Sequence, residues 1–228
     1  MSMGLSYSRL STFESCEAKF DYLYVSKSVR DRGSEATDYG SRVHEVLEHY
    51  GKGTTDVDAL SLEGKQTLKR WRHIVDAINA RSGTKHFEYQ MCVDKDLKPI
   101  DWFSPDAFIR GIADVLVIDG DTAYCLDYKT GKVRDNPTQM QLFASMVFWH
   151  FPEVNTVKTS FLWLLHDDAT NVVYKRSMLK ALWNGLEPRF QAVIETVDLG
   201  VFKTKPSGLC PWCPAQDICP DAVRRGRR

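Results

Sequence analysis

The spacing of apolar residues divides the chain into a helical first part and a mixed second part. Up to residue 85, apolar positions recur every three or four residues, which is typical of helices with one buried face. Three helices are predicted there, over residues 6–25, 39–50 and 60–80. The polar stretches 26–38 and 51–58 predict loops. We therefore expect a helical N-terminal section.

After residue 85 the pattern changes to short runs of Val, Ile, Tyr and Phe separated by turn residues, which is typical of strands. Helical spacing returns twice, with Asn136-Pro137 opening one helix and Pro188 expected to kink or break the other. The predicted order is three strands (86–94, 107–118 and 122–129), a helix (136–150), two strands (157–165 and 172–174) and a helix (175–199). This order predicts an α/β domain with a mixed β-sheet flanked by helices.

Length and composition are ordinary for a soluble protein. A chain of 228 residues can form one large domain with its own core. The 30 basic and 30 acidic residues give no net charge, and a basic groove can still be balanced by acids elsewhere. No apolar stretch is long enough to span a bilayer, and the first residues lack the pattern of a signal peptide. We therefore expect a cytoplasmic protein without a membrane partner.

Two aspartates lie within apolar strand sequence, and their presence needs a physical reason. Asp114 lies in the run 111–118, and Asp127 lies in the run 123–130. A buried carboxylate is unfavourable unless it is paired or binds a metal ion. The segment 118–122 predicts a hairpin, which would bring the two runs together.

The position of the hairpin loop decides how the two aspartates meet. With Gly120-Asp121 as the loop, Asp114 lies directly opposite Asp127. With Asp119-Gly120 as the loop, the pair is diagonal but shares one face. Because strand side chains alternate, Lys129 shares the face of Asp127. Either register predicts two carboxylates and one ammonium on one face of the sheet.

These three groups match the needs of phosphodiester hydrolysis. Two carboxylates can hold a hard divalent cation, which lowers the pKa of a water molecule and neutralises charge on the phosphate. A lysine can orient that water or stabilise the transition state. From the residues alone, an exposed hairpin with a surface ion pair is the alternative.

Four motifs, taken in order, resemble those of the PD-(D/E)xK nucleases, and in particular their RecB-like branch. They cover most of the chain and imply a restriction-endonuclease-like core. The motifs are Gly40 to Glu48 (Gly-x-x-x-His-x-x-Leu-Glu), Gly111 to Asp114 (Gly-x-x-Asp), Asp127 to Gly131 (Asp-Tyr-Lys-Thr-Gly) and Gln139 to Phe143 (Gln-x-x-x-Tyr). The last motif departs from the family pattern, because Phe143 stands where tyrosine is usual.

The resemblance implies the roles of the individual residues. The implied ligands of Mg²⁺ or Mn²⁺ are His44, Asp114, Asp127 and the backbone carbonyl of Tyr128. The implied catalytic set is Asp114, Asp127, Lys129, Gln139 and His44. Gln141 is a neighbouring alternative to Gln139. Glu88, on the first strand, could assist, although a solvated strand acid is the simpler interpretation.

The cysteines suggest a second metal site. Cys210, Cys213 and Cys219 lie close together in a section without periodicity, where a structural core is not expected. Clustered cysteines without an export signal are more often metal ligands than disulfides. A tetrahedral site needs a fourth ligand. Cys92 and Cys125 lie on predicted strands and are interpreted as buried apolar residues.

Residues 6–20 resemble the opening Ser-x-Ser-x-Leu-x-x-Phe-x-x-Cys-Pro-x-x-Phe of RecB-like nucleases that carry a 4Fe-4S cluster, a branch with AddB-type nucleases and CRISPR-associated exonucleases. This resemblance implies Cys16 as the fourth ligand, with Glu17 in place of the usual proline. Four thiolates can bind iron–sulfur or zinc, and spacing leaves both open. The resemblance implies iron–sulfur, in a cluster that joins the N- and C-terminal ends.

Together these features predict a single RecB-like nuclease domain over 1–228, with a helical part (1–85), a nuclease core (86–200) and a cysteine-rich loop (201–228). We expect a DNA nuclease of recombination or repair, of phage or mobile-element type, in a bacterial or phage-infected cell. By resemblance an exonuclease is favoured, acting on single-stranded DNA or free ends with recombination or replication proteins as partners. The alternatives are a structure-specific endonuclease, a nucleic-acid-binding module without catalysis, and a structural zinc protein.

Overall fold

The computed structural model describes residues 4–134 and 136–222, so the end of the predicted cysteine-rich loop, 223–228, lies outside the described residues. The chain divides into two compact units. Unit 1 comprises Met1–Gly4 and Ser34–Trp183, and unit 2 comprises Leu5–Gly33 and Asn184–Arg228. Unit 2 is therefore built from segments near both ends of the sequence.

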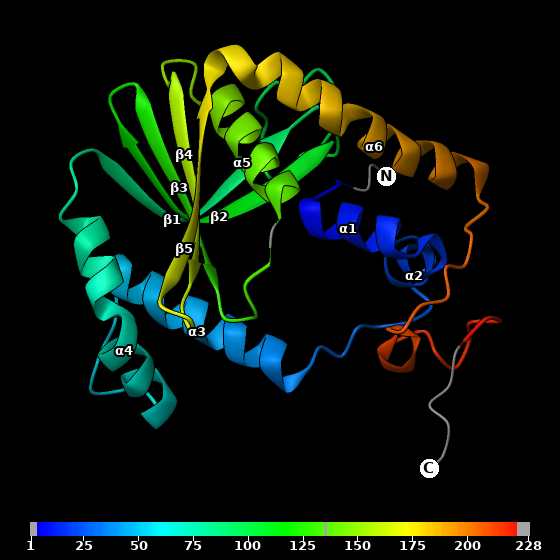
Figure 1. The fold of residues 1–228 in the computed structure, drawn as a ribbon, viewed down its shortest axis with the longest axis horizontal. Helices are drawn as coiled ribbons and strands as arrows, with labels where there is room; N and C mark the ends of the chain where they lie inside the picture. The colour runs from blue at the N-terminus through cyan, green and yellow to red at the C-terminus, as the bar shows by residue number, and fades with distance from the viewer. Residues whose placement is uncertain (1–3, 135, 223–228) are drawn as a thin grey trace. The chain divides into compact units, whose positions relative to one another are not determined.

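The centre of unit 1 is a five-stranded mixed sheet in the order β1-β2-β3-β4-β5 (Figure 1). Strands β3 and β4 are parallel, and all other neighbours are antiparallel. This architecture confirms the predicted α/β class with a mixed sheet. The strands are β1 (Thr84–Val93), β2 (Ile109–Asp119), β3 (Thr122–Lys129), β4 (Thr156–Trp163) and β5 (Asp168–Lys175).

Helices flank this sheet, as predicted (Figure 1). Helices α3 (Glu35–Gly51) and α4 (Leu62–Asn79) share an apolar core with one face of the sheet, including Val115 and Tyr128. Helix α5 (Pro137–His150) connects β3 to β4 and is buried along most of its length. Because side chains alternate along β3, the residues on either side of Tyr128 face away from the α3–α4 core, toward α5.

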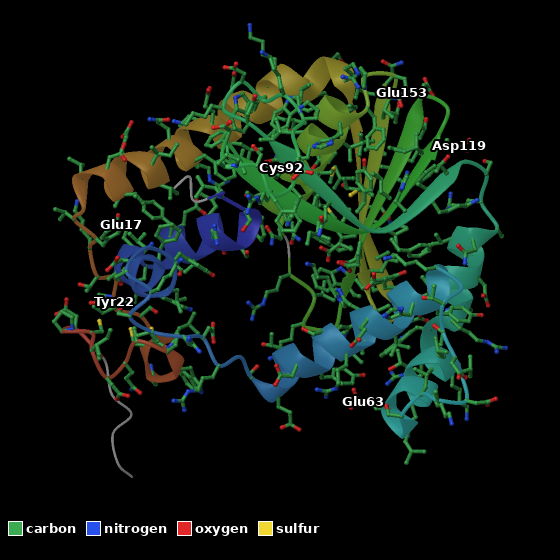
Figure 2. The ribbon with its side chains drawn as sticks, turned by 180° about the vertical axis from the view of Figure 1, so that it is seen from behind. Glu17, Tyr22, Glu63, Cys92, Asp119 and Glu153 are labelled. Carbon is green, nitrogen blue, oxygen red and sulfur yellow. The ribbon has the colours of Figure 1, made fainter. Side chains whose placement is uncertain are left out.

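Strands β2 and β3 form the predicted hairpin, with Gly120-Asp121 as its loop. Asp119, labelled in Figure 2, pairs with Thr122 next to the loop. Gly120 has a φ of 58°, a left-handed conformation that costs glycine little. Further along, Val115 pairs with Leu126. The first of the two predicted registers is therefore correct, and Asp114 and Asp127 lie directly beyond the Val115–Leu126 pair.

The predicted helix over 6–25 is divided into three pieces in unit 2. These are α1 (Tyr7–Ser15), α2 (Glu17–Phe20) and a π-helical turn, η1 (Asp21–Val25). Ser6 is the N-cap and accepts a hydrogen bond from Arg9 N at 3.3 Å. The division comes at Cys16, whose extended backbone (φ −169°, ψ 115°) ends α1 and precedes α2.

Other boundaries differ from the prediction for local reasons. Helix α3 begins inside the predicted loop 26–38, because Ser34 caps it by accepting a hydrogen bond from Thr37 N at 3.2 Å. Helix α6 (Leu179–Leu199) continues through Pro188, so the prediction of a break at this proline is wrong. The boundary between the two units falls within α6. None of the described helices is long and apolar enough to cross a membrane.

Candidate active site

Helix α3 brings His44 next to Asp114, in the middle of β2. The Nδ1 atom of His44 lies 3.3 Å from Oδ1 of Asp114. Gly40 lies one turn before His44, and a Cβ at that position would be 2.9 Å from Oγ1 of Thr130. The glycine of this motif therefore allows the helix to approach the end of β3 closely.

Asp114 is held at both of its carboxylate oxygens. It is only 9% exposed, and Oδ2 accepts a hydrogen bond from the backbone N–H of Tyr128 at 2.6 Å. Its Oδ1 faces His44, which also forms a hydrogen bond with the backbone of Tyr128. Two predicted metal ligands, His44 and Asp114, therefore lie together beside the backbone of the third, Tyr128.

Glu88 joins this group from the edge strand β1. Phe87 pairs with Val115 and Tyr89 pairs with Ala113, so Glu88 lies opposite Asp114. Its φ of 53° is rare for a residue other than glycine. His44, Glu88 and Asp114 each offer a ligand atom within 4.8 Å of the others. One imidazole nitrogen and two carboxylates are a donor set that suits a divalent cation.

A second polar group lies on the α5 side of β3. Asp127 is 7% exposed, and its Oδ1 accepts a hydrogen bond from Nε2 of Gln139 at 2.9 Å. The Nζ atom of Lys129 lies 2.6 Å from Oδ2 of Asp127 and donates to Oε1 of Gln139 at 3.2 Å. Gln139, rather than the neighbouring Gln141, makes these contacts.

The electrostatics of the two groups show crowding of negative charge. Burial, followed by the charges of Asp114 and Glu48, raises the pKa of Glu88 to about 7. Burial and the charge of Asp114 also raise the pKa of Asp127, although Lys129 opposes this shift. A divalent cation would offset the repulsion among these carboxylates, so the residues fit the divalent metal ion that the sequence resemblance implies.

The pKa of His44 responds to the same charges. Burial lowers it, but the hydrogen bond to Asp114 and the negative charges of Asp114 and Asp127 outweigh burial, and the net shift is upward. A histidine that ligates a metal ion must give up this proton. A metal ion bound at His44 would therefore compete with this proton.

The departure at Phe143 has a packing reason. Phe143 is buried on α5 and faces β2, where a Cβ added to Gly111 would lie 3.4 Å from its ring and 2.9 Å from the sulfur of Met146. Gly111 therefore gives α5 room next to the sheet. The apolar ring of Phe143 fills space in this contact.

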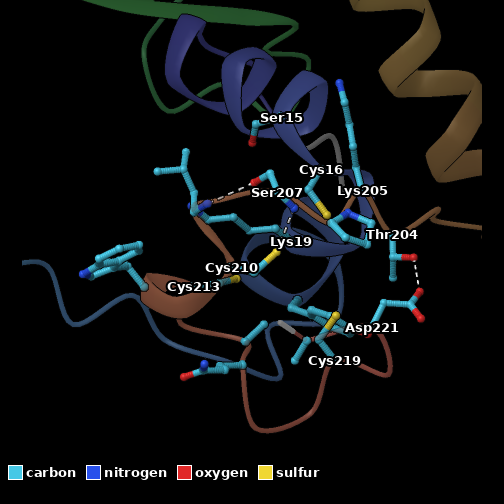
Figure 3. Close-up of a pocket in the computed structure, with 17 residues that line it drawn as sticks. Ser15, Cys16, Lys19, Thr204, Lys205, Ser207, Cys210, Cys213, Cys219 and Asp221 are labelled. Atoms are coloured by element: carbon cyan, nitrogen blue, oxygen red, sulfur yellow. Dashed lines mark hydrogen bonds between the residues drawn. The ribbon is translucent and has the colours of Figure 1, made fainter. Parts of the chain in front are cut away.

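The four cysteines of the predicted metal cluster all line one pocket in unit 2, with a volume of about 230 Å³ (Figure 3). They are Cys16, Cys210, Cys213 and Cys219, and none of them is in a disulfide. Cys210 begins a 3-10 turn, η3 (Cys210–Trp212), and its sulfur accepts a hydrogen bond from the backbone N–H of Ser207 at 3.2 Å. Cys92 and Cys125 are buried in β1 and β3, as predicted.

Hydrogen bonds within unit 2 hold the segment around Cys16 next to the C-terminal segment. Ala18 N donates to the carbonyl of Lys203 at 3.1 Å, and Lys203 N donates to Oε2 of Glu17 at 2.9 Å. The Nζ of Lys205 donates to the carbonyl of Glu14 at 2.9 Å. Glu17, which stands in place of the family's proline, therefore helps to connect the two segments.

Glu88 is the residue of the site that sequence reasoning undervalued. Lys85, His86 and Gln90 also lie in β1, so a single acid there gave no distinct signal, and its position opposite Asp114 depends on a long connection. The structure brings together His44, Glu88 and Asp114, and separately Asp127, Lys129 and Gln139.

Comparison with known proteins agrees with this fold. The family model of the PD-(D/E)XK nuclease superfamily matches residues 4–220. A crystal structure from Eubacterium rectale, of a protein provisionally described as an exonuclease, is similar with a TM-score of 0.59 and 14% identity, covering 97% of this chain and 91% of that one. The crystal structure of SSO0001 is similar with a TM-score of 0.46 and 12% identity, covering 98% and 88%. No curated protein matches the chain. Because the family model spans nearly the whole sequence, the chain belongs to the PD-(D/E)XK nuclease superfamily.

Proposed function

We propose that this protein is a DNA nuclease that depends on Mg²⁺ or Mn²⁺. The observation that carries the proposal is the contact of Asp127 with both Lys129 and Gln139, beside an Asp114 already held by His44. In a member of a nuclease superfamily, this arrangement supports a site in which carboxylates bind a cation and a neighbouring ammonium contacts a phosphate. The proposed ligands are His44, Asp114, Asp127 and the carbonyl of Tyr128.

Each side chain has a distinct task in this proposal. A bound divalent ion supplies a more acidic water and positive charge at the phosphate. The ammonium of Lys129 stabilises negative charge that develops on the phosphate oxygens. Gln139 contacts both Asp127 and Lys129, so it fixes their separation and can orient the attacking water.

The substrate and biological setting rest on the RecB-like motifs. These favour an exonuclease that acts on single-stranded DNA or free ends in recombination or repair, in the cytoplasm and with recombination or replication proteins as partners. A structure-specific endonuclease is the alternative. The proposal treats 1–228 as one nuclease domain of the RecB-like branch.

The test compares wild type with Asp127→Asn and Lys129→Ala on end-labelled linear and circular DNA with Mn²⁺. Asp127→Asn removes a ligand charge, so metal affinity should fall sharply. Lys129→Ala should lower turnover by roughly 100-fold or more, with less effect on metal affinity. Exonuclease activity predicts degradation of the linear DNA while the circular DNA stays intact.

A gel-shift experiment in Ca²⁺ separates catalysis from binding. Both variants should still bind DNA, because most affinity comes from phosphate contacts outside the site. Wild type that binds DNA but never cuts it, with any divalent metal, would show a binding module instead. Variants that cut as fast as wild type would show that these residues are not the active site.

We also propose that Cys16, Cys210, Cys213 and Cys219 bind a 4Fe-4S cluster that joins the two segments of unit 2. That all four cysteines line one pocket of about 230 Å³ supports this proposal. The N–H donor at Cys210 also suits a thiolate. The role of the cluster would be structural, because metal binding is coupled to folding.

Metal analysis of anaerobically purified protein tests the cluster. The protein should be brown and contain iron and acid-labile sulfide in equal amounts. Zinc without iron would overturn the iron–sulfur assignment and leave the four-cysteine site in place.

A further inference from the structure

A cluster of exposed basic side chains lies along α4 in unit 1, outside the acidic site formed around Asp114 and Asp127. From Lys65 to the end of α4 the helix rises roughly 21 Å. The whole chain has equal numbers of acidic and basic residues, so this grouping of one charge sign needs a local reason. The cluster, which we call the basic face, consists of Lys65, Lys69, Arg70, Arg72 and His73 on α4, Arg81 just after this helix and Lys158 on β4.

Carboxylates of the protein do not neutralise the basic face. On the neighbouring helix α3, by contrast, Arg42 is paired with Glu63 at 2.7 Å. Among the described residues, no member of the basic face forms such an ion pair. Asp76, an exposed acid of α4, instead accepts a hydrogen bond from the hydroxyl of Tyr50 at 2.9 Å. The positive charge of this surface is therefore available to an anionic partner.

Two members of the basic face are held over the same aromatic ring. The guanidinium of Arg81 lies 4.6 Å from the centroid of the Tyr124 ring, and the ammonium of Lys158 lies 5.1 Å from it. These three residues, with His73, line one hollow of about 590 Å³ between α4 and the sheet. Two like charges near one ring repel each other, and an anion between them would be attracted by both. The pair therefore has the arrangement expected of a contact with a phosphate group.

We infer that the basic face binds the phosphate backbone of duplex DNA beside the acidic site. The inference rests on the proposed nuclease function and deepens it, because it names the form of DNA that the protein holds. The two strands of a duplex offer closely spaced phosphates to such a row of cations, and no contact with the bases is needed.

The surroundings of the basic face favour a duplex over a protein or a single strand. A protein partner needs an apolar centre in its interface, but the one large apolar side chain exposed on α4 is Leu62, which precedes the basic residues. A single strand binds largely by stacking its bases on exposed aromatic rings. The rings next to the basic face do not offer this, because Trp71 is buried and Tyr124 carries the two cations.

The basic face lies one helix away from the acidic site. Helix α4 packs with α3 in one core, and α3 carries His44 of that site (Figure 1). Packed helices lie roughly 8–10 Å apart, which is much less than one turn of a duplex, about 34–36 Å. A long duplex can therefore contact the basic face and the acidic site together, whereas a very short one needs only the acidic site.

The test measures DNA binding by fluorescence anisotropy in Ca²⁺, between about 50 and 200 mM salt. The probes are a duplex of about three helical turns and a single strand of the same length. The triple variant Lys69→Gln, Arg72→Gln and Arg81→Gln should bind the duplex roughly 10-fold or more weakly than wild type. Its salt slope should fall by about 2 to 3, because each lost phosphate contact removes about 0.9. Its affinity for the single strand should change less.

A matched control removes the same amount of charge elsewhere in unit 1. The variant Lys95→Gln, Lys98→Gln and Lys180→Gln replaces three exposed lysines outside the basic face and should bind the duplex nearly as wild type does. Lys158→Gln, on β4, is a second and independent variant, which should lower the salt slope for the duplex by about 1. Circular dichroism should show that all these variants fold, since the replaced side chains are exposed.

The outcomes separate this inference from the proposed function. Equal losses of duplex affinity in the two triple variants would overturn the inference, and so would an equal loss for the single strand. Unchanged salt slopes in the basic-face variants would also overturn it, and would favour an acidic protein as the partner. Wild type that binds the duplex through the basic face but never cleaves it would contradict the nuclease proposal alone.

Discussion

His150, near the end of α5, is a titratable residue outside the acidic site whose burial affects stability in acid. Within the described chain its Nε2 atom is buried without a hydrogen-bond partner. Burial lowers the pKa of His150 from 6.5, although a hydrogen bond to the backbone of Cys92 opposes the shift. As the pH falls below about 6.5, the unfolded chain takes up a proton that the folded chain resists. The stability that this residue contributes is therefore present above that pH and lost below it.

Melting temperatures measured across this pH range test the prediction. The His150→Gln variant should lose less stability than wild type as the pH falls below about 6.5. His73→Gln is the control, because this histidine is exposed on α4, and its profile should parallel that of wild type. Parallel profiles for all three proteins would contradict the prediction.

Which residues of the site could be predicted depended on the length of the connection between them. A two-residue loop joins β2 to β3, so residue numbers alone placed Asp114 near Asp127. Residues 94–108 connect β1 to β2, and the turn at 94–98 pairs Val93 with Pro99, so it does not fix the register between the two strands. The position of Glu88 opposite Asp114 therefore needed the structure. For His44, the family resemblance supplied what periodicity alone could not.

At the scale of elements, Gly51 shows how closely α3 packs against the sheet. Gly51 is the last residue of α3, and a Cβ there would lie 2.2 to 2.7 Å from three ring atoms of the buried Phe87. Gly51→Ala should therefore destabilise the protein by about 1–3 kcal/mol through overpacking, despite the better helix propensity of alanine. Melting temperature and urea unfolding measure this change.

Gly185 provides the opposite case for the same substitution. It lies within α6, and a Cβ there would meet no atom within 4 Å. Gly185→Ala should stabilise the protein by roughly 0.5–1 kcal/mol, because alanine loses less backbone entropy in a helix. If Gly51→Ala and Gly185→Ala change the stability in the same direction, helix propensity rather than contact with Phe87 determines the effect of the substitution.

Elements with a clear apolar pattern could be predicted from the sequence, and those set by single polar contacts could not. Helix α4 and the strands β2 and β3 follow the predicted ranges closely because their buried faces are regular. The first turn of α3 is polar, so only the cap at Ser34 marks its start. The division at Cys16 interrupts no apolar pattern, since Leu10, Phe13 and Phe20 remain buried across it.

At the scale of the whole molecule, the proposed cluster and the acidic site should differ in their effect on stability. Cys16 belongs to a segment hydrogen-bonded to residues near Lys203, and its loss would leave the cluster without one ligand. Cys16→Ser should therefore lower the melting temperature of the cluster-loaded protein by several degrees. Asp114→Ala should cost less, because the lost hydrogen bond to Tyr128 is offset by relief of carboxylate repulsion.

Thermal unfolding of the two variants and wild type, purified anaerobically, checks this order. Equal melting temperatures for Cys16→Ser and wild type would contradict a structural cluster. Cys92→Ser is an informative control, because this cysteine is buried in β1 and does not line the pocket, so its loss should leave the iron content unchanged.

The division of the chain into two units could not be predicted from the spacing of apolar residues. The spacing of apolar residues predicted three successive sections, because it reports only on residues that are close in the sequence. Contacts such as Glu14 with Arg189, at 2.6 Å, join residues far apart in sequence and depend on the folded path of everything between them. In the sequence, the cysteine motif and the motif around His44 indicated such long-range connections.

The composition of unit 2 also has a consequence for biosynthesis. Residues 5–33 leave the ribosome before any part of the sheet, and residues 184–228 leave it after the last strand. Since domains fold during translation from the N-terminal side, unit 1 can form while Cys16 still lacks its partner segment. A newly made chain would therefore acquire its acidic site first, and the proposed cluster could assemble only once residues 210–219 have emerged. If the proposed cluster contains iron, the protein that accumulates in cells short of iron should be folded in unit 1 and open to proteolysis in unit 2.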